Sequence, residues 1–305
     1  MVMPLVPNNS LQQSQLLGLL GHTDGAYILM LKSFIVIISL TTISSLAAAE
    51  SSIESTSRKD ITFTPPNVET HASVIDMNEL KVCAETNPKC ASALGVFYLY
   101  GKGVEQNYQA AFESFSFAAQ HDLGTAYFHI GIMHKDGVIT GKSDYVEAFK
   151  AFSSGATLGD RPSQIFLASA YETGEGVEIN YEKALKWHLA ASAQGDDTEQ
   201  RKTCDYYLNG WGSEINYEKS FEYCKRASLN GNAIAAQRLA NHFYKGWGVE
   251  KDVMKAYSLL VVSKKLGNSD VDKYLPQVKN LLSDEQILKS QDEIQFWLNE
   301  ISRQE

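Results

Sequence analysis

Five glycines recur at an almost constant interval, and this recurrence constrains the fold more than any other feature of the chain. Successive glycines are 36, 37, 36 and 36 residues apart. They are Gly101, Gly137, Gly174, Gly210 and Gly246. A fixed period of roughly 20 to 50 residues is typical of proteins that stack one supersecondary unit on the next. The sequence therefore predicts an array of similar units, each about as long as a helical hairpin.

The segment before each glycine has the spacing of one helix face. An aromatic residue or a histidine stands three positions before the glycine, and mostly an aliphatic residue stands seven before it. These positions lie on one side of a helix with 3.6 residues per turn. The residues three before the glycine are Tyr98, His134, Tyr171, Tyr207 and Phe243. We therefore expect a first helix before each glycine.

A second helix is expected after each glycine. Its start is marked by a residue whose side-chain oxygen can cap a backbone N–H group. These N-caps are Asn107, Asp144, Asn180, Asn216 and Asp252. A residue suited to the left-handed conformation past a helix end closes each unit. These closing residues are Asp122, Gly159, Gly195, Gly231 and Gly267.

This pattern resembles the Sel-one-like repeat family, a branch of the tetratricopeptide-type solenoids. The resemblance is clearest in LASAYETGEGVEINYEKALKWHLAASAQGD, at residues 167–196, and in RLANHFYKGWGVEKDVMKAYSLL, at residues 238–260. It implies an all-α, right-handed α-solenoid with about five helix-turn-helix repeats over residues 91–267. Two departures, Ile139 for the second loop glycine of the second unit and Ser213 for the loop valine of the fourth, predict looser turns there.

Capping helices are expected at both ends of the array. Residues 74–90 are expected to hold the N-terminal cap, and residues 268–305 the C-terminal caps. In the second segment, Pro276 interrupts a helix, and Ser283 with Gln286 forms the pattern of a capping box. The apolar residues Ile287, Ile294, Trp297 and Ile301 then form a stripe suited to docking on the last repeat.

The N-terminal part of the chain resembles an export leader. Residues 30–49 contain a lysine, an apolar run and three alanines, in the order of a signal peptide, which predicts cleavage after Ala49. Residues 1–29 are interpreted as an extension upstream of the true start, Met30. Residues 50–73, rich in Ser and Thr, are expected to form a flexible linker. The alternative is an uncleaved anchor, although the apolar run is short for a membrane span.

Composition and motifs restrict the function. The formal net charge of −9 argues against a nucleic-acid partner, which requires a basic face. The chain contains no nucleophile elbow, no S-x-x-K, no H-E-x-x-H and no phosphate-binding loop. We therefore predict no catalytic residues, no cofactor and no metal ligands. His134 and His188 occupy repeat positions that hold aromatic residues in other units, so both are interpreted as packing residues.

The four cysteines are even in number, and three pairings are open in an oxidising compartment. Cys204 stands at the small position of a first helix, and Cys224 stands at the position facing it in the second helix. We therefore predict a Cys204–Cys224 disulfide, with Cys83–Cys90 joining the N-terminal cap to the first unit. Cysteine-rich secreted members of the resembled family have comparable spacing. The alternative is that Cys204 is only a small core residue.

Two tryptophans are the candidate binding residues. Trp211 and Trp247 each stand between the two loop glycines of adjacent units, and Tyr206 and His242 share one first-helix position in the same units. Aromatic residues are enriched at binding hot spots. The four side chains are therefore a predicted binding patch. In the alternative, each ring folds over its own hairpin.

The leading hypothesis for function is a periplasmic or secreted scaffold that binds a protein or peptide through its concave or loop surface, without catalysis and without a membrane anchor after cleavage. The first alternative is a weak β-lactam-binding or cell-wall-related hydrolase, which the resemblance suggests. The second alternative is a structural or assembly factor of the cell envelope.

Overall fold

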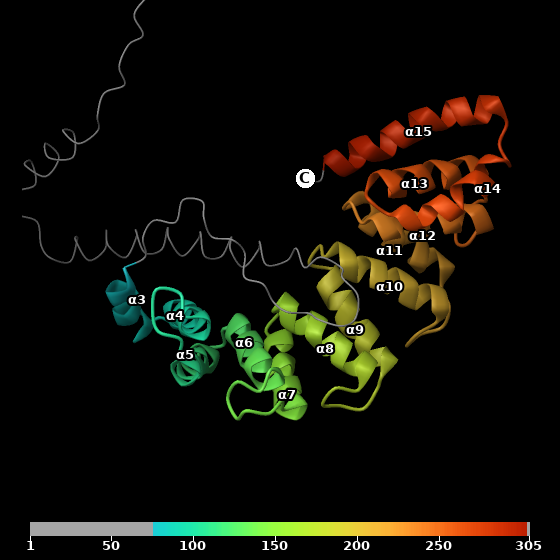
Figure 1. Ribbon diagram of the computed structural model, residues 1–305. Coiled ribbons are helices and arrows are strands. Elements are labelled where there is room, and N and C mark those ends of the chain that lie inside the picture. The colour runs from blue at the N-terminus through green and yellow to red at the C-terminus, as the bar shows by residue number, and fades with distance from the viewer. Residues whose placement is uncertain (1–75, 304–305) are drawn as a thin grey trace, which may run out of the picture. The chain divides into compact units, whose positions relative to one another are not determined.

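The computed structural model describes residues 76–303, and the secondary structure of this part of the chain is entirely helical. The expected extension, signal peptide and linker lie outside the described residues. Helical hairpins follow one another in chain order (Figure 1). They are α4 (Pro88–Tyr100) with α5 (Tyr108–Gln120), α6 (Gly124–Lys135) with α7 (Tyr145–Thr157), α8 (Arg161–Thr173) with α9 (Tyr181–Ser192), α10 (Asp197–Asn209) with α11 (Tyr217–Leu229), and α12 (Ala233–Lys245) with α13 (Val253–Lys265). The predicted α-solenoid of five hairpins is thus confirmed.

The N-terminal cap is shorter than the sequence suggests. Helix α3 covers Met77–Ala84, and a turn separates it from α4. The side chain of Asn87 accepts a hydrogen bond from the Lys89 N–H group, and Pro88 fits the first turn because it needs no donor there. The first hairpin therefore begins at Pro88, inside the segment expected to be the cap.

The C-terminal cap consists of two short helices followed by one long helix. They are a 3-10 helix, η1 (Ser269–Lys273), α14 (Leu275–Lys279) and α15 (Asp284–Ser302). Ser283 and Gln286 make both hydrogen bonds of a capping box at the start of α15. Ile294, Trp297 and Ile301 are buried on the side of α15 that packs on the last repeat. Along the described chain, no helix is both long and apolar enough to span a bilayer.

Each hairpin turn is built on the same hydrogen bond. In every unit, the backbone N–H of the second helix's N-cap donates to the carbonyl oxygen of the residue three before the anchor glycine. The N···O distance is 2.9 Å in every unit, from Asn107 to Tyr98, Asp144 to His134, Asn180 to Tyr171, Asn216 to Tyr207 and Asp252 to Phe243. Four of the anchor glycines are left-handed C-caps. The second hairpin differs because α6 ends at Lys135, and its C-cap is Asp136, one residue before Gly137.

In the third to fifth hairpins, the second loop glycine connects the turn to the hairpin before it. An added Cβ would lie 2.0 Å from the Tyr145 carbonyl oxygen at Gly176, and 2.2 Å from that of Tyr181 at Gly212. At Gly248 the corresponding distance, to the Tyr217 carbonyl, would be 2.4 Å. Only a residue without a Cβ fits so close to a neighbouring backbone. This contact fixes the turns of the third to fifth hairpins against the preceding second helix.

Inside each hairpin, a small residue of the first helix faces a large residue of the second. A Cβ on Gly131 would lie 2.5 Å from the Phe152 ring, and one on Gly95 would lie 2.7 Å from the Phe115 ring. Cys204 and Cys224 occupy the equivalent pair of positions in the fourth hairpin. They form a disulfide with a Cα–Cα distance of 5.2 Å, and Cys83–Cys90 forms a second one across α3 and α4.

Candidate interaction surface

Exposed apolar side chains gather where the hairpins of the third to fifth units turn. We call this surface the turn edge. Its exposed side chains are Ile179, Tyr181, Trp211, Ile215 and Tyr217, and the half-buried Trp247 packs beside Tyr217. Ile179 and Ile215 are each 56% exposed, and Trp211 is 47% exposed. Large apolar side chains at such exposure do not contribute to the core, so their clustering is characteristic of an interaction surface.

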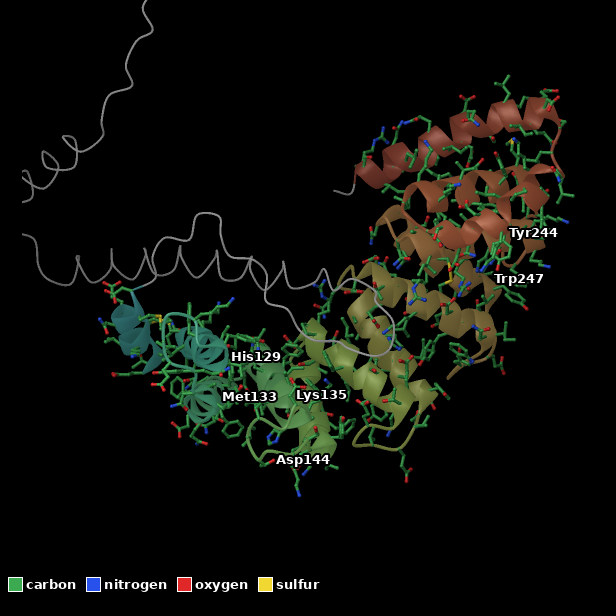
Figure 2. The ribbon with its side chains drawn as sticks, in the orientation of Figure 1. His129, Met133, Lys135, Asp144, Tyr244 and Trp247 are labelled. Atoms are coloured by element: carbon green, nitrogen blue, oxygen red, sulfur yellow. A yellow bond between two sulfur atoms is a disulfide. The ribbon has the colours of Figure 1, made fainter. Side chains whose placement is uncertain are left out.

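The Trp247 ring packs across the boundary between two hairpins. It follows α12 in the chain (Figure 2) but lies parallel to the Tyr217 ring at the start of α11. The centroids are 5.6 Å apart, and the ring planes differ by 5°. The close seating of Gly248 on the Tyr217 carbonyl brings the two rings together. The alternative interpretation of this ring, in which it folds over its own hairpin alone, does not include this contact.

Beneath the tryptophans lie the two residues that share a first-helix position. Tyr206 contacts Trp211 edge-to-face, with 5.5 Å between ring centroids, and His242 contacts Trp247 in the same way at 6.1 Å. Tyr206 is 2% exposed and His242 is fully buried. Trp211 is therefore exposed to the solvent and Trp247 is half-buried, whereas Tyr206 and His242 lie buried beneath them. Burial also lowers the pKa of His242 below its ordinary value, which favours the neutral ring.

Acidic side chains surround the exposed rings. The turns of the third and fourth hairpins carry exposed glutamates, namely Glu175, Glu178, Glu182, Glu214 and Glu218. The nearby lysines are held elsewhere, because the Nζ atoms of Lys183 and Lys219 lie over the rings of Tyr171 and Tyr207 at 5.3 and 5.0 Å. The turn edge thus combines apolar rings with negative charge.

A charged network that sequence reasoning missed lies under the same edge. His188 on α9 bonds Glu199 on α10 through Nδ1, and its Nε2 atom lies 3.1 Å from Glu172 Oε1 on α8. The Tyr206 hydroxyl donates to the same Glu172 oxygen at 2.7 Å, and Lys202 Nζ lies 2.8 Å from Glu199 Oε1. His188 packs against Tyr206, as its aromatic repeat position predicts, but it also joins the third and fourth hairpins electrostatically.

The charges of this network stabilise one another. Burial acts to lower the pKa of His188, but its hydrogen bonds to Glu172 and Glu199 raise that pKa above its ordinary value. Burial acts to raise the pKa of Glu199, yet the bond from His188 and the nearby Lys202 hold that pKa below the usual range. The available sequence signal was Glu199 itself, since the other units place Cys90, Ala126, Ser163 or Ala235 eleven residues before the anchor glycine.

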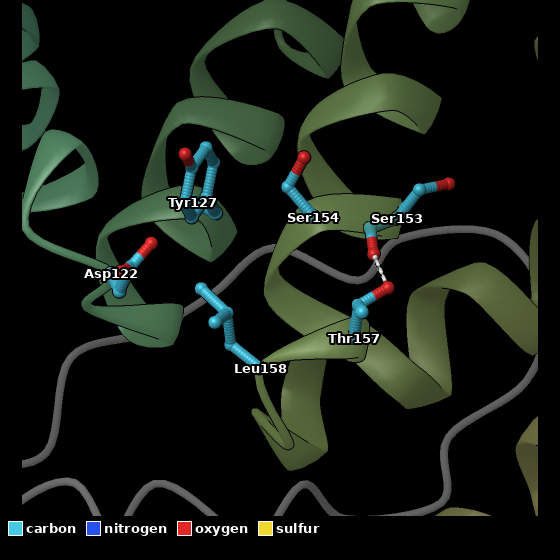
Figure 3. A pocket seen from close by; sticks show the side chains of 6 residues that line it. All are labelled: Asp122, Tyr127, Ser153, Ser154, Thr157 and Leu158. Carbon is cyan, nitrogen blue, oxygen red and sulfur yellow. Dashed lines mark hydrogen bonds between the residues drawn. The ribbon is translucent and has the colours of Figure 1, made fainter.

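Two hollows lie away from the turn edge. One, of about 360 Å³, lies between α6 and α7 and is lined by hydroxyl-bearing side chains, Leu158 and Asp122 (Figure 3). The other, also of about 360 Å³, lies between the last repeats and α15, with Phe296 and Trp297 in its wall. The first hollow holds no histidine or cysteine that could act with its serines, so we assign it no chemistry.

Solved structures similar to this chain share its fold. One is c5321, described as a protective antigen present in uropathogenic Escherichia coli strains displaying an SLR fold, with 27% identity and a TM-score of 0.62. That match covers 75% of this chain and 48% of the antigen, so this chain spans about half the antigen's length. A Sel1 repeat protein from Oxalobacter formigenes matches with 24% identity and a TM-score of 0.59, over 75% of this chain and 98% of that one.

Comparison with protein families gives a more direct result. No curated protein matches the chain in sequence. The Sel1 repeat matches five consecutive segments, residues 88–123, 117–160, 161–196, 200–232 and 233–268. These segments coincide with the five hairpins, and together they cover more than half of the sequence. This chain therefore belongs to the Sel1 repeat family.

Proposed function

We propose that this protein is an exported scaffold whose turn edge binds a basic, extended segment of a partner protein. The observation that carries the proposal is the exposure of Trp211, Ile215 and Tyr217 beside the glutamates of the same turns. Sel1 repeats usually mediate protein interactions, which supports a binding role. The scaffold performs no chemistry in this proposal, since its task is to hold the partner.

The chemistry of the turn edge favours a cationic partner. Aromatic faces attract arginine and lysine side chains, and they also bury apolar side chains. Glutamates around the rings add a long-range attraction for positive charge, and they speed the encounter at low salt. An acidic segment would meet like charge at the same place. We therefore expect a partner segment that contains arginine or lysine alternating with apolar residues.

The binding test uses synthetic peptides on the oxidised protein. A fluorescent peptide of alternating arginine and leucine is compared with its glutamate-leucine counterpart by anisotropy, at low and at high salt. We expect the basic peptide to bind more tightly and to weaken as salt rises. Trp211→Ala and Trp247→Ala should each reduce its affinity several-fold, because truncating a hot-spot ring typically costs 1 kcal/mol or more, about 5-fold.

Phe296→Ala is the matched control. Phe296 is an aromatic residue on α15 that is 53% exposed, but it lies outside the turn edge. Its truncation should leave peptide binding unchanged, and all three variants should retain the helical circular-dichroism spectrum. Equal binding of the basic and acidic peptides would refute the proposal, as would equal loss of affinity in the Phe296 variant.

Export is the second part of the proposal. Two disulfides are typical of an oxidising compartment, and the alanines ending at Ala49 supply a cleavage site for the predicted leader. Mass spectrometry of protein recovered from outside the cytoplasm should give an N-terminus at Glu50. An N-terminus upstream of Met30 would contradict both the leader and the interpretation of residues 1–29.

A further inference from the structure

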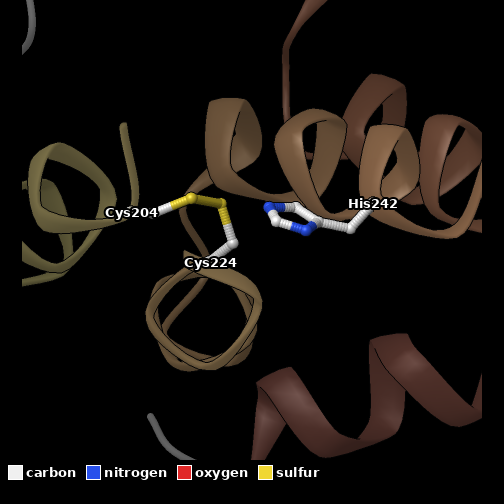
Figure 4. Close-up of side chains that lie close together, drawn as sticks. All are labelled: Cys204, Cys224 and His242. Atoms are coloured by element: carbon white, nitrogen blue, oxygen red, sulfur yellow. A yellow bond between two sulfur atoms is a disulfide. The ribbon is translucent and has the colours of Figure 1, made fainter. Parts of the chain in front are cut away.

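Three potential metal ligands from consecutive helices meet in the core of the last two repeats. They are Cys204 on α10, Cys224 on α11 and His242 on α12, and all three are fully buried. A sulfur atom of each cysteine and a ring nitrogen of the histidine lie within 4.8 Å of one another. Figure 4 shows the His242 ring directed toward the disulfide. The repeat pattern accounts for the cysteines as a packing pair, but it does not account for the histidine beside them.

The hydrogen bonds of His242 orient it as a ligand. Its Nδ1 atom lies 2.7 Å from the carbonyl oxygen of Trp247, which can only accept, so Nδ1 carries the proton. Its Nε2 atom therefore presents a lone pair toward the cysteines. It lies 3.0 Å from Ser220 Oγ, whose hydroxyl also lies within donating distance of the Cys204 carbonyl oxygen, at 3.0 Å. Metal-binding histidines are held in the same way, with the second ring nitrogen donating to a carbonyl or carboxylate.

We propose that the thiol form of this protein binds one copper(I) ion through Cys204 Sγ, Cys224 Sγ and His242 Nε2. The chain is synthesised with free thiols, so this form precedes the disulfide. Each thiol releases one proton to solvent as its thiolate binds, and the copper ion keeps its charge, so no electron is transferred. Around an ion with bonds of about 2.0 to 2.3 Å, the ligand atoms would lie roughly 4 Å apart. The two sulfur atoms must therefore move apart from the bonding distance that they have in the disulfide, whereas a ring nitrogen of His242 already lies within 4.8 Å of both.

The ligand set and its surroundings favour copper(I) over zinc. Thiolates select soft ions, and imidazole binds both copper and zinc. Zinc sites are almost always four-coordinate, and in a site with three protein ligands water fills the fourth position. This core is closed to solvent, so it suits an ion that three soft ligands satisfy. The disulfide and the ion exclude each other, because both use the same two sulfur atoms.

The second cysteine pair supplies an internal control. In the described part of the chain, Cys83 and Cys90 belong to no comparable group of ligands. The binding experiment therefore uses the full-length mature protein with Cys83→Ser and Cys90→Ser, reduced and kept free of oxygen. Copper(I) is added in competition with a chromogenic chelator. We expect one ion per chain, and X-ray absorption should show two sulfur neighbours and one nitrogen neighbour.

Variants and oxidation states then test the assignment. In the same background, His242→Gln should weaken copper binding at least 10-fold, because it removes the nitrogen ligand. The oxidised protein, with Cys204–Cys224 closed, should bind no copper in competition with the chelator. The proposal fails if the spectrum of the unmutated site shows no nitrogen neighbour, if the oxidised form binds equally well, or if zinc(II) displaces the copper. The X-ray absorption result does not depend on whether the His242 variant folds.

Discussion

The indole ring of Trp247 lies parallel to the phenol ring of Tyr217, with 5.6 Å between the two centroids. The two residues belong to different hairpins, since Tyr217 begins α11 and Trp247 follows α12. Their contact therefore joins the fourth and fifth repeats at the same edge where we propose that a partner binds. Stability and recognition are coupled there, because the partner would rest on rings that also connect neighbouring repeats.

A double-mutant cycle measures this connection. Trp247→Ala, Tyr217→Ala and the double variant should reveal a coupling free energy of about 0.5 to 1.5 kcal/mol, as is typical of aromatic pairs. Urea denaturation followed by circular dichroism supplies the free energies of unfolding. Tyr181→Ala combined with Trp247→Ala is the control, because Tyr181 lies one repeat earlier and its loss should be additive.

The second loop glycines should tolerate substitution less well than the closing glycines. Gly195→Ala should cost about 1 to 2 kcal/mol, because the φ angle of 90° is unfavourable for alanine but a Cβ there meets nothing within 4 Å. Gly212→Ala should cost distinctly more, since its Cβ would also collide with the Tyr181 carbonyl oxygen. Thermal and urea unfolding of the two variants, compared side by side, checks this order. Equal losses of unfolding free energy in the two variants would contradict the close contact between the turn and the preceding hairpin.

The network around His188 should make stability depend on pH. The raised pKa of His188 stabilises the fold at pH values below 6.5, and this contribution is lost as the pH rises through the raised value. The lowered pKa values of Glu172 and Glu199 stabilise it above pH 4.5, and that contribution is lost as the pH falls through them. The network should therefore contribute most between pH 4.5 and 6.5.

Two variants distinguish the contribution of this network to pH-dependent stability from that of other titrating groups. His188→Phe leaves Glu199 buried without its histidine and should destabilise the protein by roughly 3 to 5 kcal/mol. His188→Phe combined with Glu199→Ala restores residue types found at these positions in other repeats, so it should recover much of that loss. Unfolding free energies measured from pH 4 to 9 should vary less in the double variant than in the unmutated protein. An unchanged pH profile would show that other groups control it.

The Cys204–Cys224 disulfide should contribute about 3 kcal/mol in the chain-entropy model, because its cysteines are 20 residues apart. Replacing them by alanine and leucine, as at Ala240 and Leu260 of the fifth repeat, keeps the hairpin packed and removes the bond. Urea denaturation of this variant and of the oxidised protein gives the difference. Cys83→Ala with Cys90→Ala should cost slightly less, since those cysteines are only 7 residues apart.

The sequence predicted the hairpins well because their determinants are local and repeated. Each anchor glycine, each N-cap and the capping box at Ser283 act within a few residues of their own position, so their spacing alone reveals them. Even Asp122, predicted to replace a closing glycine, has a positive φ of 57°. The unusual second turn was also visible, since Asp144 follows His134 by ten residues where the other units have nine.

Contacts between units were harder to predict because they depend on residues that do not recur at the same position of every repeat. His188, Glu172 and Glu199 come from three helices, and none of them recurs at its repeat position in all units. The sequence likewise placed the predicted binding residues in the correct turns, but it did not predict which rings each tryptophan contacts. Trp211 and Trp247 are alike in sequence, but one rests mainly on Tyr206 and the other also lies parallel to Tyr217.

The seating of each loop glycine on the preceding tyrosine carbonyl has a consequence for how such an array can grow. A copied hairpin of the third or fourth kind carries both a glycine for the unit before it and a tyrosine for the unit after it. A duplicated unit of this kind could therefore be inserted into the array without substitutions in the neighbouring units. The second hairpin has Ile139 in place of that glycine, so it cannot make this contact with a preceding hairpin. It therefore could not replace the third or fourth hairpin in the array.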